Sequence, residues 1–337
     1  MAMSTHGGSR PATGRIRDTV LLGLALVSLT VVSAWSLFIG VSDIGLSDLL
    51  RAESSKMLLF VESRVPRLAA ILLSGSAMGV VGLIMQSLVR NRFVAPTTAG
   101  TVDAASLGLA IATVWFASAS VFLKMTIAVI FALAGTALFM ALVQRLRYAA
   151  DIIVVPLIGI MLGGVIQAAA TFIALRYDLL QSLSAWTNGD FSGILRGRYE
   201  LLYLVGAMTV MAYLFANRFT LAGMGRDVAV NLGVNYHRVL YGGMALAASV
   251  SAVVVVVVGG IPFLGLVVPN LVTMTMGDNL RRVLPLTAVS GAFFVLVCDI
   301  VSRTIRFPYE IPVGTVVGVV GGAIFLALVL RSRFSAG

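Results

Sequence analysis

The chain has 337 residues, of which 59% are hydrophobic and only 11% are charged, and its mean hydropathy is +1.02. A soluble globular domain cannot bury that much apolar surface, so the composition predicts a polytopic membrane protein. The net charge of +10 does not indicate nucleic-acid binding, because the arginines are scattered in pairs at the ends of hydrophobic segments and form no basic stripe. We expect them to anchor the chain against anionic membrane lipid.

Ten hydrophobic segments follow one another along the chain, each close to the length that can cross a membrane. The hydrocarbon core of a bilayer is about 30 Å thick, so a spanning helix needs about 20 apolar residues. The segments cover residues 20–41, 66–85, 94–116, 122–143, 152–175, 199–217, 238–258, 262–277, 284–303 and 312–330. The run from Val253 to Val258 lacks the alternation of apolar and polar residues that barrel strands show. We therefore expect an all-α membrane protein of about ten helices.

The predicted organisation is one membrane domain, residues 20–331, between two short polar tails at 1–19 and 332–337. The first hydrophobic segment is longer than the core of a signal peptide and has no clear cleavage site, so we expect it to be retained. If both termini are cytoplasmic, fourteen of the 24 basic residues lie inside and ten lie outside. The positive-inside rule thus favours cytoplasmic termini, and a polar segment at 218–237 then also faces the cytoplasm.

The sequence lacks the residues of an enzyme or of a metal site. Its only lysines, Lys56 and Lys124, do not follow a glycine-rich loop, which excludes a P-loop and ATP hydrolysis by this chain. One cysteine, Cys298, and two histidines, His6 and His237, provide no cluster of metal ligands. We expect no catalytic residue, no metal site and no bound cofactor on this chain.

Residues 222–234 form a polar stretch between two membrane-length segments. Its charges, small residues and paired glycines are typical of a short helix that lies across a membrane surface and is gripped by another protein. The residues that we single out are Gly223, Gly225, Arg226, Asp227, Asn231, Leu232 and Gly233. The alternative is an ordinary solvated loop that contains a capped helix.

Glycines recur at four-residue spacing in several predicted helices. The sets are Gly75 with Gly79, Gly159 with Gly163, and Gly314 with Gly318 and Gly322. Small residues at this spacing allow two helix backbones to approach closely, and the same bare face could instead line a transport pathway. The polar residues predicted within spans, Gln86, Asp103, Gln167, Asn270 and Asp299, form no cluster of the kind that an ion-coupled carrier uses near the midplane.

Four motifs in fixed order carry a specific resemblance. They are RVPRL at 64–68, GLIMQSLVRN at 82–91, GIPFLGLVVPN at 260–270 and PYEIPVG at 308–314. Together they resemble the FecCD-type permeases of ABC importers, the ten-helix type II importers of ferric siderophores, haem and vitamin B12. The resemblance covers about residues 20–331.

Three further stretches are similar to permeases for catecholate-type siderophores, the enterobactin and petrobactin group. They are NRFVAPTTAGT at 91–101, Trp186 with GDF at 189–191, and GRYELLY at 197–203. Asn270 stands where many family members carry histidine, which weakens an interpretation as a haem or vitamin B12 permease.

The resemblance implies a permease subunit that moves a ferric siderophore through the bacterial inner membrane. The implied partners are a second permease (this chain or a sister chain), an external solute-binding protein, and a dimer of cytoplasmic ABC ATPases that binds ATP and Mg²⁺. The segment at 218–237 would be the coupling region that docks in the ATPase.

The resemblance also implies roles for residues elsewhere. Arg64, Arg67 and Arg303 would face acidic residues of the binding protein, although arginines near a membrane end also snorkel to the interface. The residues expected to border the translocation path are Gly159, Gly163, Gln167, Gly314 and Gly318.

Two other classes of function stay open on the sequence alone. An ion- or proton-coupled secondary transporter of a small metal chelate would work without an ATPase, and a channel would pass ions without saturation. Neither class accounts for a docking segment together with external arginines. Co-purification with an ATPase and ATP-dependent uptake separate the three classes.

Overall fold

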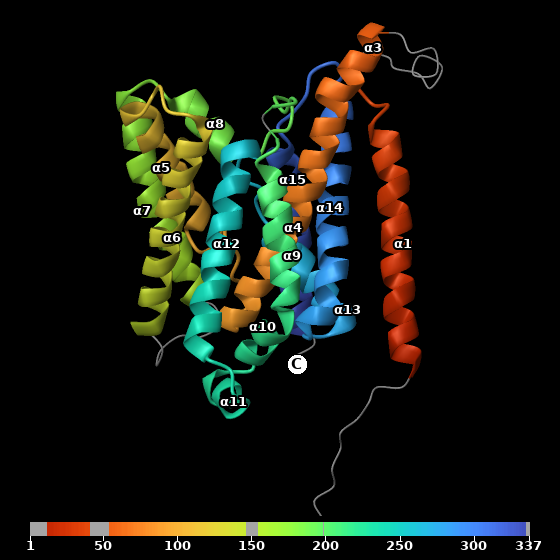
Figure 1. Cartoon of the computed structure of the whole chain (residues 1–337), viewed down its shortest axis with the longest axis vertical. Helices are drawn as coiled ribbons and strands as arrows, with labels where there is room; N and C mark the ends of the chain where they lie inside the picture. Colours follow the sequence, from red (N-terminus) through yellow and green to blue (C-terminus); the bar gives the residue numbers. More distant parts are fainter. Residues whose placement is uncertain (1–11, 41–53, 146–153, 198, 335–337) are drawn as a thin grey trace, which may run out of the picture.

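The computed structural model describes residues 12–40, 54–145, 154–197 and 199–334, and this part of the chain is helical with no strand. Most of the long helices run along a common direction and form a bundle (Figure 1). In chain order the helices are α1 (Ala12–Ser36), α3 (Ser54–Leu59), the π-helical turn η1 (Phe60–Arg64), α4 (Val65–Val89), α5 (Thr101–Trp115), α6 (Val121–Arg145), α7 (Val154–Arg176), α8 (Leu180–Thr187), α9 (Leu202–Leu214), α10 (Ala216–Gly223), α11 (Arg226–Asn231), α12 (Tyr236–Val258), α13 (Leu264–Met276), α14 (Leu280–Thr304) and α15 (Val313–Phe334).

The expected all-α membrane fold of about ten helices is confirmed. Within the described residues, seven helices are long and apolar enough to cross a membrane, and α9 with α10 makes an eighth span that is bent by 61°. The shorter apolar helices α5 and α13 coincide with two further predicted segments. Each of the ten hydrophobic segments therefore contains a helix.

Some boundaries differ from the prediction. Helix α1 begins at Ala12, well before the predicted start at residue 20, and α15 continues to Phe334. Two elements were not predicted: α8, and the extension of α4 through α3 and η1, which makes an apolar helical stretch from Met57 to Val89. Residues 1–11 and 335–337 of the predicted tails lie outside the described part of the chain.

Helix α4 is the central helix of the fold. It is buried along most of its length and packs against α14, α12, α13 and α9. Gly75 lies against the backbone of Gly291, and Gly82 lies so close to Gly265 that a Cβ would overlap its backbone. The glycines of α4 are therefore packing residues, as four-residue spacing favours.

Helices α5, α6 and α7 form a second group at one side of the bundle (Figure 1). Gly159 of α7 contacts the backbone of Thr98 and Ala99, and Gly163 contacts Gly100 and the carboxylate of Asp103. Gly100 has a φ of 73°, a left-handed conformation that a side chain would disfavour. The start of α5 is thus held tightly against α7.

Several helices keep open apolar faces, and α7 and α15 are two of them. On α7, Met161, Val165 and Phe172 are 65%, 71% and 72% exposed, and on α15 Val319 is 70% exposed. Faces of this kind in a membrane protein contact lipid or a further subunit. They lie between the two ends of the bundle, which we call the α11 end and the α8 end after the helices found there (Figure 1).

Candidate functional site

The predicted short helix exists as α11, which projects beyond the bundle (Figure 1). Gly225 precedes it with a φ of 115° and Gly233 follows it with a φ of 76°, so both turns use conformations that favour glycine. Ala229 is the buried residue of α11, whereas Val230 and Leu232 are 55% and 58% exposed. Exposed apolar side chains on a projecting helix are typical of a protein–protein contact.

The charged residues of this segment are available to a partner. Arg226 and Asp227 are exposed, and neither has an ion pair with another described residue. Asn231 is also exposed. The structure thus brings the predicted coupling residues together on one projecting element.

This element rests on the end of the central helix. Gly223 lies against Ser87 in the last turn of α4, and Gly225 lies near the guanidinium of Arg90. The hydroxyl of Thr220 on α10 accepts a hydrogen bond from the Leu280 amide at 3.2 Å. Helices α4 and α14 are therefore both in contact with the segment that carries α11.

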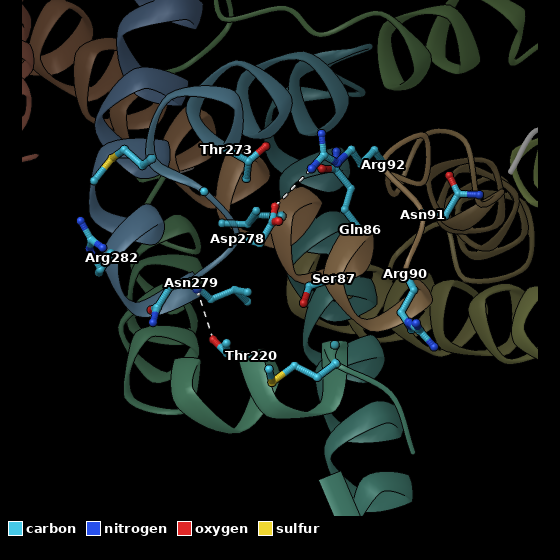
Figure 2. A pocket seen from close by; sticks show the side chains of 16 residues that line it. Gln86, Ser87, Arg90, Asn91, Arg92, Thr220, Thr273, Asp278, Asn279 and Arg282 are labelled. Carbon is cyan, nitrogen blue, oxygen red and sulfur yellow. Dashed lines mark hydrogen bonds and ion pairs between the residues drawn. The ribbon is translucent and has the colours of Figure 1, made fainter. Parts of the chain in front are cut away.

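A cavity of about 1120 Å³ opens beside this segment, between the end of α4, α10 and the turn from α13 to α14 (Figure 2). Arg92 and Asp278, which both line it, form an ion pair at 3.4 Å, and Arg282, which also lines it, pairs with Asp18 of α1. The sequence could not predict this cavity, because its walls come from three segments that are far apart in the chain.

Two intramembrane polar residues support the cavity wall. Gln86 donates to the carbonyl of Gly265 at 3.1 Å, and Asn270 donates to the carbonyl of Arg92 at 2.8 Å. The first bond joins α4 to the start of α13, and the second joins α13 to the turn that follows α4. Both residues therefore act as cross-links between backbone segments.

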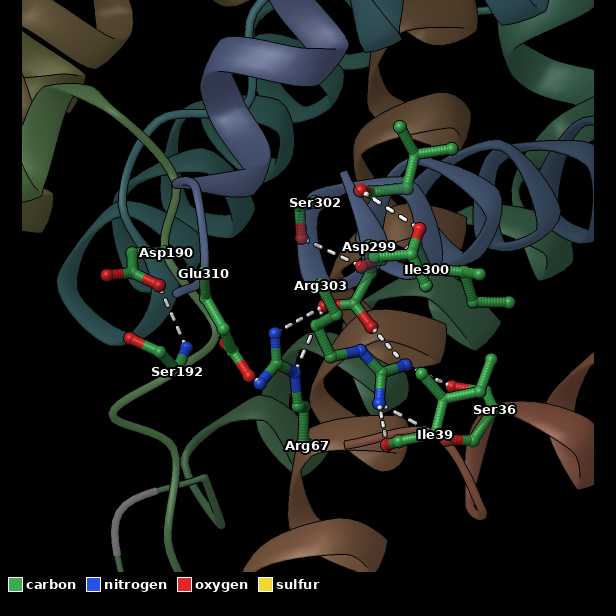
Figure 3. A network of polar contacts seen from close by, with 12 residues as sticks. Ser36, Ile39, Arg67, Asp190, Ser192, Asp299, Ile300, Ser302, Arg303 and Glu310 are labelled. Carbon is green, nitrogen blue, oxygen red and sulfur yellow. Dashed lines mark hydrogen bonds and ion pairs between the residues drawn. The ribbon is translucent and has the colours of Figure 1, made fainter. Parts of the chain in front are cut away.

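At the α8 end, the predicted docking arginines form a polar network (Figure 3). Arg67 donates to Asp299 from Nε at 3.0 Å and from Nη2 at 2.8 Å, and to Glu310 from Nη1 at 2.8 Å. Arg303 pairs with the other oxygen of Asp299 at 2.6 Å. Asp299 is fully buried, and the two arginines neutralise it from opposite sides.

The network also reaches the end of α1. Arg303 donates to the carbonyls of Ser36 and Ile39 at 3.2 and 2.8 Å. Arg64 donates to the carbonyls of Leu37 and Ile39 at 3.0 and 2.5 Å. These bonds satisfy carbonyls that the end of a helix leaves without a partner.

The three predicted docking arginines are not equally accessible. Arg303 is only 5% exposed, so it does not present its guanidinium to an external protein in this conformation. Arg64 and Arg67 also have internal partners, although the bond from Arg67 to Glu310 lies at the surface. Arg306 is exposed and lies over the ring of Tyr309, with its Cζ 6.0 Å from the ring centre.

The structure places most of the glycines expected along the translocation path at packing contacts. Gly159 and Gly163 point into the contact with residues 98–103, and Gly314 is buried against Asn188 and Gly189. These positions correspond to the packing alternative. Gly318 is half-buried near Pro262, and Gln167 has a buried Oε1 with no hydrogen-bond partner among the described residues.

A comparison with known proteins places the chain in a family. Residues 28–331 match the model of the FecCD transport family, so the chain belongs to the FecCD family of membrane permeases. It is 47% identical to the petrobactin import system permease protein YclN of Bacillus subtilis, over 91% of this chain and 97% of that protein. It is 42% identical to the ferric-anguibactin transport system permease protein FatD of Vibrio anguillarum, over 88% and 95%.

The fold agrees with a solved structure. A metal-chelate type ABC transporter in an inward-facing conformation superposes with a TM-score of 0.79 at 24% identity, over 93% of this chain and 99% of that one. This similarity concerns the fold. The chain is thus a multi-pass membrane permease with the architecture of an ABC importer subunit.

Proposed function

We propose that this chain is the permease subunit of an ATP-driven importer and that its substrate is a ferric siderophore of the catecholate type. The observation that carries the proposal is the 47% identity to a petrobactin import permease over nearly the full length of both proteins. A second petrobactin import permease, FatD of Bacillus anthracis, is 43% identical over 92% of this chain. Sequence identity of this extent is a better guide to the class of substrate than a shared fold is.

In this proposal the α11 end faces the cytoplasm of a bacterium and the α8 end faces outward. The α11 end carries Arg90, Arg92, Arg226, Arg281 and Arg282, in keeping with the positive-inside rule. Both termini then lie in the cytoplasm. An external solute-binding protein would deliver the substrate to the α8 end.

The partner at the cytoplasmic end is a dimer of ABC ATPases, which would hold ATP and Mg²⁺. Helix α11 offers it apolar side chains together with Arg226 and Asp227, two charges that form no ion pair within the described residues. A closure of the ATPases that pushes α11 would be transmitted as a rigid-body movement, because α10 packs against α4 and α14. The chain itself supplies no nucleotide site.

A second permease, either another copy or a sister chain, would cover the open faces of α7 and α15. The passage would then lie between the two subunits and be bordered by exposed apolar residues such as Met161, Val165 and Val319. A bulky ferric chelate needs a wide passage that binds it weakly. The candidates for its border are Gly159, Gly163, Gln167, Gly314 and Gly318.

Co-expression with the ATPase of the same transport system tests this proposal. We expect the two proteins to co-purify in detergent, and we expect phosphate release from ATP only when the ATPase is present, since this chain has no P-loop. Robust hydrolysis by the chain alone, or full transport of the chelate by the chain without the ATPase, would overturn the proposal. The second outcome would favour the ion-coupled carrier.

A further inference from the structure

Arg67 is shared by two carboxylates that differ sharply in burial. Asp299 is fully buried, whereas the side chain of Glu310 is 26% exposed. Arg67 holds Asp299 through two of its nitrogens and holds Glu310 through Nη1 alone. One side of the guanidinium is thus fixed in the protein interior and the other faces the surface.

The bond to Asp299 is not exchangeable. Asp299 also pairs with the buried Arg303, and removal of one partner from a buried ion pair leaves an uncompensated charge, which is strongly destabilising. The bond to Glu310 is different, because water reaches it and exposed ion pairs contribute little to stability. Glu310 is therefore the partner that another carboxylate can replace.

Glu310 lies in the segment that leads into α15. The next residue, Ile311, donates its amide to the carbonyl of Ser302 at 3.1 Å, and Gly314 donates to the carbonyl of Gly189 at 2.7 Å. These bonds tie the segment that carries Glu310 to the end of α14 and tie the first turn of α15 to Gly189. This helix carries one of the open apolar faces of the chain.

The charge of this surface favours the binding of an acidic side chain from a partner. The buried pair of Arg303 and Asp299 is neutral in itself, which leaves Arg67 and Arg306 against the single carboxylate of Glu310 among the described residues of the network. An arginine fork pairs well with a carboxylate in a two-pronged geometry. An incoming acid would therefore find a cation whose other half is already held in place.

We propose that docking of the solute-binding protein exchanges carboxylates at Arg67, with an acid of that protein replacing Glu310 at Nη1 and thereby releasing the segment before α15. This inference rests on the proposed function. In this exchange Arg67 can act as a docking residue although Asp299 and Glu310 already bind it in the isolated chain. Docking would thereby change the start of α15, while the buried Asp299 stays in place.

Removal of the competing charge should strengthen docking. In E310Q, Arg67 keeps Asp299 and loses its charged surface partner, so the binding protein no longer has to displace a carboxylate. We expect a dissociation constant about two- to fivefold lower than that of the wild type. This range corresponds to the free energy that an exposed ion pair contributes. E62Q is the matched control, because Glu62 pairs with Arg196 at 3.3 Å at the same end and is exposed.

The measurement is the affinity of the purified solute-binding protein, loaded with ferric petrobactin, for the complete transporter in nanodiscs. A third variant, R67K, keeps a cation beside Asp299 but lacks the fork that serves two acids. We expect E310Q to have no further effect in the R67K background, as a double-mutant cycle would show. Hydrogen exchange at the Ile311 amide should accelerate in E310Q and on docking to the wild type, and should stay unchanged in E62Q.

The outcomes separate this inference from the proposed function. If the wild type binds the protein but E310Q binds it as E62Q does, or more weakly, the exchange is refuted while the importer assignment stands. Unchanged exchange at Ile311 on docking refutes it equally. If the wild-type transporter does not bind the loaded protein at low or high salt, the docking itself is refuted and the exchange falls with it.

Discussion

Gly223 at the end of α10 lies against Ser87 in the last turn of α4, so closely that a Cβ on Gly223 would overlap the serine side chain. Near the other end of the same helix, Arg67 holds Asp299 and Glu310. These two positions on α4 are twenty residues apart, which corresponds to about 30 Å of helix. One continuous helix therefore joins the segment that carries α11 to the arginine network at the α8 end.

Charge reversal on α11 should uncouple the ATPase. We expect R226E combined with D227R to weaken association with the ATPase about tenfold, because both side chains are exposed and available to a partner. Expression and membrane insertion should be normal, since α11 lies outside the spans. Pull-down from solubilised membranes measures the loss. R145E, a charge reversal on an exposed residue at the same end, should bind normally, and equal binding by all variants would remove α11 from the interface.

The central packing of α4 predicts a pair of glycine variants with opposite results. G82A should destabilise the fold by about 1–3 kcal/mol, because the new methyl group overlaps the backbone of Gly265. G164A adds the same methyl group to α7 where nothing lies within 4 Å, and alanine favours a helix over glycine. Thermal unfolding in detergent compares the two. Similar unfolding temperatures would contradict the packing described for α4.

The buried carboxylate of Asp299 should be essential for folding. We expect D299N to lower the free energy of unfolding by about 3–5 kcal/mol, since it leaves Arg67 and Arg303 without their shared counter-charge. The loss should persist at high salt, because a buried pair is poorly screened. D278N is the control: its pair with Arg92 is exposed, and we expect almost no change. A D299N variant as stable as D278N would contradict the network.

The spans could be predicted because length and hydropathy act locally along the chain. The same holds for α11, whose flanking glycines and charges stand next to each other in the sequence. Helix α8 was missed because its sequence, LQSLSAWT, is short and only partly apolar. Helix α1 begins at Ala12, ahead of its apolar segment, because hydropathy does not indicate how far a helix continues into polar sequence.

The roles of the arginines could not be predicted from local pattern. The partners of Arg67 lie 232 and 243 residues away in the chain, so nothing near RVPRL indicates that this side chain is already occupied. The packing of the glycines could not be predicted either, because four-residue spacing indicates a bare helix face but not which segment packs against it. For Gly159 and Gly163 the cover is residues 98–103 of the same chain.

ATP-driven import is tested most directly by the uptake of ⁵⁵Fe-labelled petrobactin into proteoliposomes. The vesicles contain this chain, a second permease and the ATPase. The solute-binding protein is added outside, and ATP is enclosed. ATP-driven import predicts accumulation that requires hydrolysable ATP, is lost when R226E and D227R are combined, and is unaffected when the proton gradient is collapsed. Accumulation without ATP that disappears with the proton gradient would contradict it.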